Sequence, residues 1–343
     1  MKVDVFLSAI EPTDAPNRAR ELAATGVDGL FSFEGPHDVF FPLVLASQAV
    51  ELDLMTNVAI AFPRSPMHMA NAAWDLAGLS SGRFRLGLGT QIKPHIEKRY
   101  GSTWSAPVSR MRDYVGALKA IFHAWESGER LNYRGPFFTH TLMTPNFTPR
   151  SLAWGPPPIY IGALGPNLTA MTAEVADGLL VMPFNSMAHF ETVTRPAINA
   201  GLAAGGRVAS DLDVVAEVIV ATGDSDATIA AALKAVKGLL SFYGSTPAYK
   251  TVLDAQEYGH LQPDLNQLSK TGDWLGMMAL IPDDLARRIA VVGTPQECAI
   301  EIHRRFGAVA SRVCVYFPGY AISDDTIAAL ASAIHETAPG GTA

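Results

Sequence analysis

The chain has 343 residues, of which 48% are hydrophobic and 17% charged, and its 26 Lys and Arg against 33 Asp and Glu give a net charge of −7. This composition is typical of a globular protein, and an acidic balance without a basic run argues against nucleic-acid binding and against attachment to an anionic membrane surface. The two cysteines, Cys298 and Cys314, exclude a disulfide framework and a cysteine-based metal cluster. Since the chain also has no signal-peptide pattern and no apolar run of about 20 residues, we expect a cytoplasmic protein that does not enter membranes.

Short apolar or β-branched runs alternate with longer stretches of helical period along the whole chain. The eight runs that we predict to be strands cover residues 3–8, 29–33, 56–61, 84–89, 158–162, 178–182, 213–221 and 312–317. The predicted helices cover residues 15–25, 41–52, 68–80, 107–125, 166–176, 187–204, 227–243, 295–306 and 324–335. Strands and crossover helices in this order predict an α/β fold, a (β/α)8 TIM barrel with insertions at the C-terminal face.

Three segments are too long to be simple connections, and they cover residues 93–106, 131–157 and 243–285. Long ordered loops in a compact domain usually form lids, binding walls or interfaces. We therefore expect one domain over residues 1–337 that carries these three excursions, followed by a flexible tail over residues 338–343.

Candidate catalytic residues are expected where barrel strands end, because the loops at that face carry the active site of such folds. Glu34 and His37 follow the second predicted strand, and a short loop could bring both side chains to the barrel axis as acid and base. The alternative is that the two residues only organise their loop through hydrogen bonds.

Two glycine-containing turns are candidates for binding an anion. The turn from Gly162 to Pro166 leads directly into a helix, whose free N–H groups could receive a phosphate, although such turns also occur for steric reasons alone. The run Gly87-Leu88-Gly89-Thr90 has the same ambiguity and lacks the spacing of a dinucleotide-binding fingerprint. The nine histidines show no spacing typical of metal ligands, so no metal site is predicted.

Four motifs resemble those of one protein family. They are Ala61-Phe62-Pro63-Arg64-Ser65-Pro66, the run LSSGRFRLGLGT from Leu79 to Thr90, Arg110-Met111-Arg112, and Ala176-Asp177-Gly178. On these motifs the chain resembles, over nearly its whole length, the luciferase-like flavin- and deazaflavin-dependent oxidoreductases, and within them the branch that uses coenzyme F420.

The resemblance implies a (β/α)8 barrel, a homodimer formed through the second and third helices, and a binding site for the tricyclic cofactor. Members of the family often have a cis peptide bond between non-proline residues in the third strand, which would fall near Asn57-Val58 here. The cofactor-binding residues that the resemblance implies are Asn57, Val58, Ala59, Gly89, Thr90, Gln91, Ala163, Leu164, Gly165 and Pro166, the last four as a phosphate cradle.

The chain departs from the family at the end of the second strand. Many deazaflavin-dependent members have an Asp-His pair there, whereas here Glu34 aligns with the acid and Gly35 with the imidazole. Either Glu34 or His37 is therefore expected to handle the proton.

The function that we predict is that of a coenzyme F420-dependent oxidoreductase, which transfers a hydride between a reduced deazaflavin and a small organic or peptide-borne acceptor. The segment 243–285 supplies only Lys250 and Lys270, too few cations for a sugar phosphate, so reduction of an uncharged C=C or C=N bond is favoured. One alternative is an FMN-dependent luciferase-like monooxygenase. Another is a non-catalytic deazaflavin carrier, which the missing imidazole at Gly35 would suit.

Overall fold

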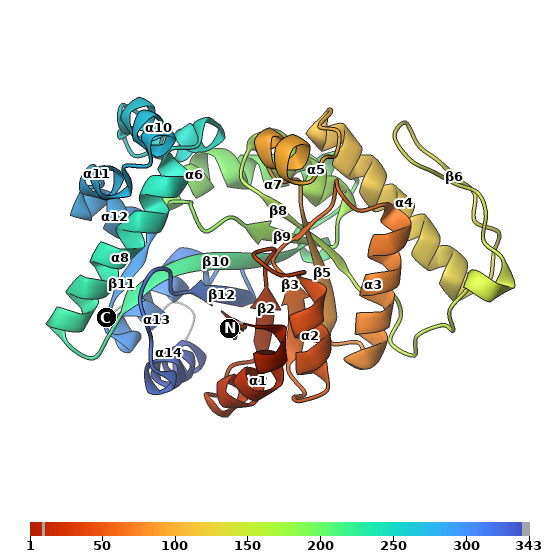
Figure 1. The fold of residues 1–343 in the computed structure, drawn as a ribbon, viewed down its shortest axis with the longest axis horizontal. Coiled ribbons are helices and arrows are strands. Elements are labelled where there is room, and N and C mark those ends of the chain that lie inside the picture. Colours follow the sequence, from red (N-terminus) through yellow and green to blue (C-terminus); the bar gives the residue numbers. More distant parts are fainter. Residues whose placement is uncertain (9–10, 338–343) are drawn as a thin grey trace.

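In the computed structural model, which describes residues 1–8 and 11–337, eight parallel strands close into a barrel surrounded by helices (Figure 1). The barrel strands are β1 (Lys2–Phe6), β2 (Gly29–Ser32), β3 (Asp53–Thr56), β5 (Phe84–Gly89), β8 (Ile159–Ala163), β9 (Gly178–Val181), β10 (Asp213–Thr222) and β12 (Arg312–Tyr316). Each strand pairs with the next in this order, and β12 pairs with β1 to close the ring. The predicted (β/α)8 barrel is confirmed.

The helices follow the apolar periodicity of the sequence. They are α1 (Ala15–Ala24), α2 (Phe40–Ser47), α3 (Pro66–Leu79), α4 (Pro107–Ser127), α5 (Pro166–Val175), α6 (Met187–His189), α7 (Arg195–Ala204), α8 (Asp226–Gly244), α9 (Lys250–Asp254), α10 (Leu261–Thr271), α11 (Trp274–Ala279), α12 (Asp283–Ile289), α13 (Pro295–Phe306) and α14 (Asp324–Glu336). Helix α13 illustrates why they form, because Thr294 and Glu297 cap its first turn reciprocally and Pro295 occupies its first position. Its buried Cys298, Ile302 and Phe306 then lie on one face.

The third strand differs from its predicted range of residues 56–61. It begins at Asp53, stops at Thr56, and continues as the short strand β4 (Ala59–Ile60), which pairs with β5. The prediction was wrong at the start of the strand because Asp53 interrupts the apolar pattern, although its carboxylate is satisfied inside the structure by Arg85 and Arg312.

Charged side chains close the end of the barrel where the strands begin. Arg312 is 2% exposed and forms ion pairs with Asp4 and Asp53. Burial raises the pKa of Asp4 to about 6, against the opposing effect of Arg312. On β8 and β10, the Tyr160 hydroxyl donates a hydrogen bond of 2.7 Å to Asp213. These contacts fill this end of the barrel, so a binding site inside the barrel would open at the opposite end.

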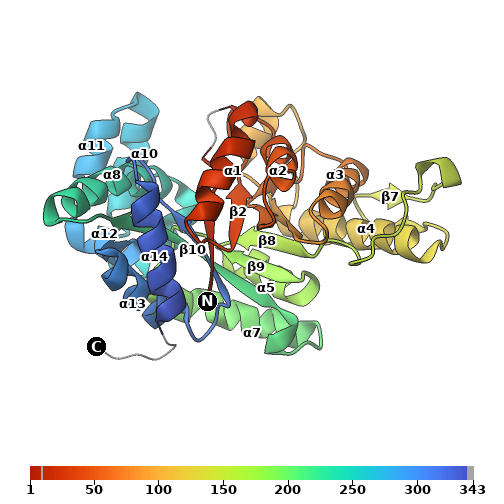
Figure 2. The same ribbon diagram turned by 90° about the horizontal axis from the view of Figure 1, so that it is seen from below.

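The segments between barrel strands contain further regular structure. Residues 95–99 form a π-helix, and β6 (Tyr133–Arg134) and β7 (Thr139–His140) form a hairpin. The short strand β11 (Val291–Gly293), which the sequence pattern missed, pairs with the end of β10. Helix α8, predicted as a simple crossover helix, packs against α10, α11 and α12 as well as β10. Figure 2 shows these helices on one side of the barrel and the β7 hairpin beyond α4 on the other.

A buried polar network ties the loop after β9 to this group of helices. The His189 Nδ1–H donates to Asn185 Oδ1 at 2.9 Å, and His189 Nε2 lies 3.3 Å from the Thr251 hydroxyl. Gln256 donates to the Ser186 hydroxyl at 2.9 Å. Burial lowers the pKa of His189 to about 4, so the imidazole is neutral at physiological pH.

No helix in the described part of the chain combines the length and the apolar character that crossing a membrane requires. The predicted tail over residues 338–343 lies outside the described residues.

Candidate functional site

The connection between β3 and β4 forms a bulge at the open end of the barrel. The Asn57–Val58 peptide bond is cis, as the resemblance implied. The backbone is held on both sides, because the Asn57 N–H donates to Ser32 at 2.6 Å and the Thr56 hydroxyl bonds both backbone groups of Gly87 at 2.8 and 2.9 Å. The bulge places the half-buried Val58 side chain at the edge of the barrel interior.

Three glycines leave room for this bulge. A Cβ atom on Gly87 would lie 1.9 Å from the Thr56 carbonyl oxygen, and one on Gly89 would lie 2.4 Å from Val58 Cγ2. At Gly162 of β8 the distance to Val58 Cγ1 would be 3.2 Å. The glycines of β5 and β8 therefore form a wall without side chains, against which Val58 lies.

The predicted cofactor-binding residues come from neighbouring strands, since β3, β5 and β8 are adjacent in the barrel. Thr90 and Gln91 follow β5, and Gln91 has a φ of 58°, with its side chain accepting a hydrogen bond from the Ile92 N–H at 2.9 Å. Ala59 is fully buried in β4, so only its backbone faces the bulge.

The fifth βα turn is open at its helix. Gly165 precedes α5 with no side chain capping the helix N-terminus, and the space where its Cβ would lie is empty to 4 Å. Pro166 occupies the first helical position and is exposed. The side chains of Ala163 and Leu164 are buried in the packing behind the turn, so their backbone alone faces this opening.

Glu34 is held by an extended set of contacts. Its carboxylate accepts hydrogen bonds from the Ile60 N–H at 3.0 Å and from Arg64 at 2.8 Å, and Arg64 also binds Asp38 at 2.8 Å. These two carboxylates raise the pKa of Arg64 in spite of its partial burial. Burial, with the nearby Glu34 charge, also raises the pKa of Tyr100. The Glu34 side chain is only 7% exposed and links the second strand to the bulge.

His37 does not join Glu34. Its Nε2 lies 3.3 Å from a carboxylate oxygen of Glu11 in the loop after β1, and its side chain is 39% exposed. The structure does not pair Glu34 with His37 as expected, because Glu34 binds Arg64 after β4 and His37 lies against Glu11 in the loop after β1.

A second group of polar side chains, which the sequence analysis missed, lies on the opposite wall of the barrel. Glu217 of β10 is half-buried. Burial, together with the nearby Glu217 charge, raises the pKa values of Tyr316 of β12 and Tyr243 of α8. Burial raises the pKa of Glu217 to about 8. The nearby Asn57 amide is buried and opposes this rise by favouring the charged carboxylate, but burial has the larger effect. The sequence signal was a single acid in the apolar run from Val214 to Ala221.

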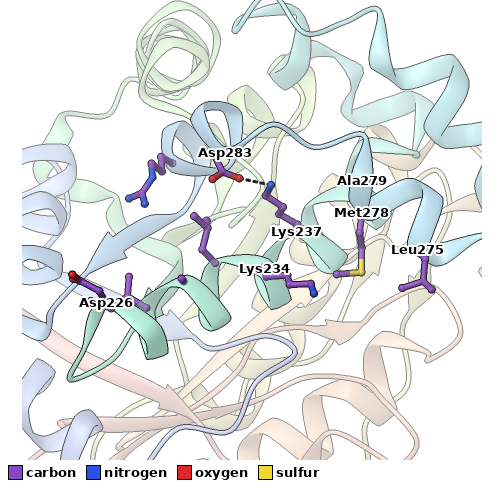
Figure 3. Close-up of a pocket in the computed structure, with 11 residues that line it drawn as sticks. Asp226, Lys234, Lys237, Leu275, Met278, Ala279 and Asp283 are labelled. Atoms are coloured by element: carbon purple, nitrogen blue, oxygen red, sulfur yellow. Dashed lines mark ion pairs between the residues drawn. The ribbon is translucent and has the colours of Figure 1, made fainter.

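A separate groove lies in the helical layer. A groove of about 650 Å³ runs between α8, α11 and α12, with Leu275 and Met278 on one wall and the Lys237–Asp283 ion pair at its edge (Figure 3). None of the predicted site residues lines it. Within residues 1–8 and 11–337, no cluster of His, Cys, Asp and Glu side chains has the arrangement needed to hold a metal ion.

Comparison with known families settles the relationship. The profile of the luciferase-like monooxygenase family matches residues 2–312. The chain belongs to this family. An uncharacterized protein of Mycobacterium tuberculosis is 45% identical to this luciferase-like protein over 304 residues, which are 88% of this chain and 89% of the relative.

More distant relatives of this luciferase-like protein have names that describe a reaction. The 5,10-methylenetetrahydromethanopterin reductase of Archaeoglobus fulgidus is 28% identical over 276 residues, 80% of each chain. The structure of the coenzyme F420-dependent tetrahydromethanopterin reductase from Methanopyrus kandleri superposes with a TM-score of 0.80 and 18% identity, covering 98% of both chains. At that identity the superposition supports the shared fold.

Proposed function

We propose that this luciferase-like protein is a coenzyme F420-dependent oxidoreductase that transfers a hydride between the deazaflavin and a small organic or peptide-borne acceptor. The observation that carries the proposal is the bulge at Val58 against the glycine wall of β5 and β8, beside the uncapped start of α5. The reductase name of the 28% identical relative supports the same chemistry.

The residues at the bulge fit a flat, phosphate-tailed cofactor. A ring system would lie against Val58 and the side-chain-free surface of Gly89 and Gly162, where any Cβ would intrude. Asn57, Ala59, Thr90 and Gln91 would border it. Ala163, Leu164, Gly165 and Pro166 would direct backbone N–H groups and the positive end of α5 toward a phosphate. When bound, a deazaflavin supplies a carbon that donates or accepts a hydride.

The chain itself has to orient the acceptor and manage one proton. Glu34 and His37, which follow the second strand, remain our proposed residues for this task. Glu34, tied to Arg64 and to the Ile60 N–H, fixes the loop and the bulge together, and we propose that the exposed His37 relays the proton between solvent and the site. A rate loss in His37→Ala at unchanged cofactor affinity would separate proton handling from loop organisation.

The proposed acceptor is uncharged, with a C=C or C=N bond as the reducible group. Of the two cations in segment 243–285, Lys250 is already paired with Asp254, which leaves Lys270 as the cation of this segment that could meet a phosphorylated acceptor.

Binding and oxygen consumption test the proposal directly. The purified protein is titrated with F420 and with FMN, each oxidised and reduced, by following cofactor fluorescence, and oxygen uptake is recorded with both reduced cofactors. We expect tight F420 binding without oxygen uptake, and F420H2 oxidation in a panel of enones and imines. Oxygen uptake that depends on reduced FMN would instead establish the monooxygenase chemistry after which the family is named. Binding of F420 without turnover of any acceptor would support the carrier alternative.

We also propose a homodimer formed through α2 and α3. Phe41 on α2 is 64% exposed, and Leu45 and Leu79 on these helices are 37% and 45% exposed. Sedimentation of Phe41→Glu, with Leu275→Glu on α11 as the matched control, should show a monomer for the first variant only.

A further inference from the structure

The wall of the barrel opposite the glycines carries a carboxyl group that the proposed cofactor site does not use. Alternate residues of β10 point into the barrel. Asp213 binds Tyr160 at the bottom, and Val215 packs in the interior cluster with Cys314. Glu217 is the next inward residue and pairs in register with Cys314 of β12. It therefore borders the interior cluster that contains Val215 and Cys314, and its contact with Asn57 places it beside the bulge.

The groups that face Glu217 come from every element around it. Tyr316 and Cys314 lie on β12, Tyr243 on α8, and the Asn57 amide on the bulge, while β9 contributes the apolar Leu180. No salt bridge reaches Glu217 from any described residue. Burial is the largest effect on the carboxyl and raises its pKa to about 8, so the acid form dominates at neutral pH.

A purely structural role does not account for this arrangement. A buried carboxyl without a hydrogen-bonded partner destabilises a fold, and such groups are usually paired. Here the Asn57 amide favours the charged carboxylate of Glu217 but only partly offsets the effect of burial, and Glu217 keeps part of its surface accessible. Glu217 and Asn57 thus lie together in the part of the barrel interior where Val58 and Phe6 pack against the interior cluster and Tyr316 lies edge-on to Phe6.

We propose that Glu217 is the proton donor to the acceptor, which binds in this space with its reducible bond facing Val58 and its polar atom directed at Glu217 and Asn57. This inference rests on the proposed F420-dependent function. It assigns the neutral carbonyl or imine class of acceptors, since a protonated carboxyl donates a hydrogen bond to a lone pair and does not attract a cation.

The reaction balances with solvent as the final proton source. Glu217 gives its proton to the acceptor as the neighbouring carbon gains a hydride, together with both electrons, from the reduced deazaflavin. The carboxylate then regains a proton from water, and the proton that the oxidised cofactor releases returns to water. A donor whose pKa lies close to the working pH suits such a step.

The first test needs no cofactor. A difference infrared titration of the cofactor-free protein from about pH 6 to about pH 10 follows the band of protonated carboxyl groups. We expect a band that disappears with a midpoint of about 8 in the parent and is absent in Glu217→Gln. The matched control is Asp213→Asn, which removes an inward acid from the same strand and should keep the band. Absence of this band from the parent would overturn the proposal, because Glu217 would then have no proton to give.

The second test measures turnover. With reduced F420 and an enone or imine that the parent accepts, Glu217→Gln should lose about 10²- to 10⁴-fold in kcat with little change in F420 affinity. The parent's rate should fall above about pH 8, and this alkaline limb should be missing in the variant. Parental kcat and pH profile in Glu217→Gln would refute the proton-donor role and leave the proposed function standing. Failure of the parent to bind F420 would overturn both.

Discussion

The contact between Gly89 and Val58 makes a quantitative prediction for Gly89→Ala. The added Cβ would lie 2.4 Å from Val58 Cγ2, more than 1 Å inside the roughly 3.5 to 4.0 Å at which carbon atoms pack. Because the Thr56–Gly87 hydrogen bonds hold the backbone on both sides, the overlap must be relieved by moving Val58. Overpacking of this kind costs about 1 to 3 kcal/mol, so we expect Gly89→Ala to unfold at correspondingly lower denaturant concentration.

A double-mutant cycle isolates this contact. Val58→Ala removes both methyl groups that the new Cβ would meet, so Gly89→Ala should cost little in that background, and the two changes should couple by about 1 to 2 kcal/mol. Gly78→Ala in α3 is the control, since its Cβ would lie 3.4 Å from Leu152 Cδ2, an ordinary contact, and alanine favours the helix. Urea unfolding of the four proteins measures the coupling. Additive effects within about 0.5 kcal/mol would refute the reasoning that Val58 dictates glycine at position 89.

Three further predictions concern buried ionisable groups. Glu34→Gln, which weakens the contact to Arg64, should lower the free energy of unfolding by about 1 to 3 kcal/mol in thermal or urea unfolding, whereas an unchanged stability would make the ion pair incidental. The pKa of His189 falls from 6.5 to about 4 on folding, so its contribution to stability is complete above pH 6.5 and is lost toward pH 4. The free energy of unfolding, measured by urea unfolding, should therefore fall by at most about 1.4 kcal/mol per pH unit as the pH decreases through this window. This pH dependence should disappear in His189→Gln. The pKa of Glu217 rises from 4.5 to about 8 on folding, so the folded state loses stability as the pH increases through this window. The free energy of unfolding of Glu217→Gln should therefore increase relative to the parent by up to about 1.4 kcal/mol per pH unit. Equal pH profiles of stability in the two proteins would contradict this prediction.

The barrel was predictable because alternation of strands and helices is encoded locally. Apolar runs bounded by glycines, such as the one ending at Gly89, mark parallel strands whatever their partners are. The start of β3 was not predictable, because Asp53 is polar in sequence and its counter-ions Arg85 and Arg312 come from distant strands.

The same contrast separates the glycines of the cofactor wall, which a local motif predicts, from the acidic residues Glu217 and Glu34, whose surroundings depend on distant parts of the chain. Steric needs concentrate glycine in a local pattern, and the family motif contains Gly87 and Gly89. The inward direction of Glu217 depends on the parity of β10, which a continuous apolar run does not reveal because both faces of a barrel strand are covered. The separation of Glu34 from His37 depends on Arg64 and Glu11, two tertiary partners that no spacing rule supplies. Cytoplasmic location stays a prediction.

The ion pairs around Arg312 also bear on the order of binding that the proposed function implies. Because charged side chains close the end of the barrel where the strands begin, a cofactor and an acceptor bound inside the barrel would both enter through its open end. The molecule bound deeper would then bind first and leave last, so steady-state kinetics should show an ordered mechanism.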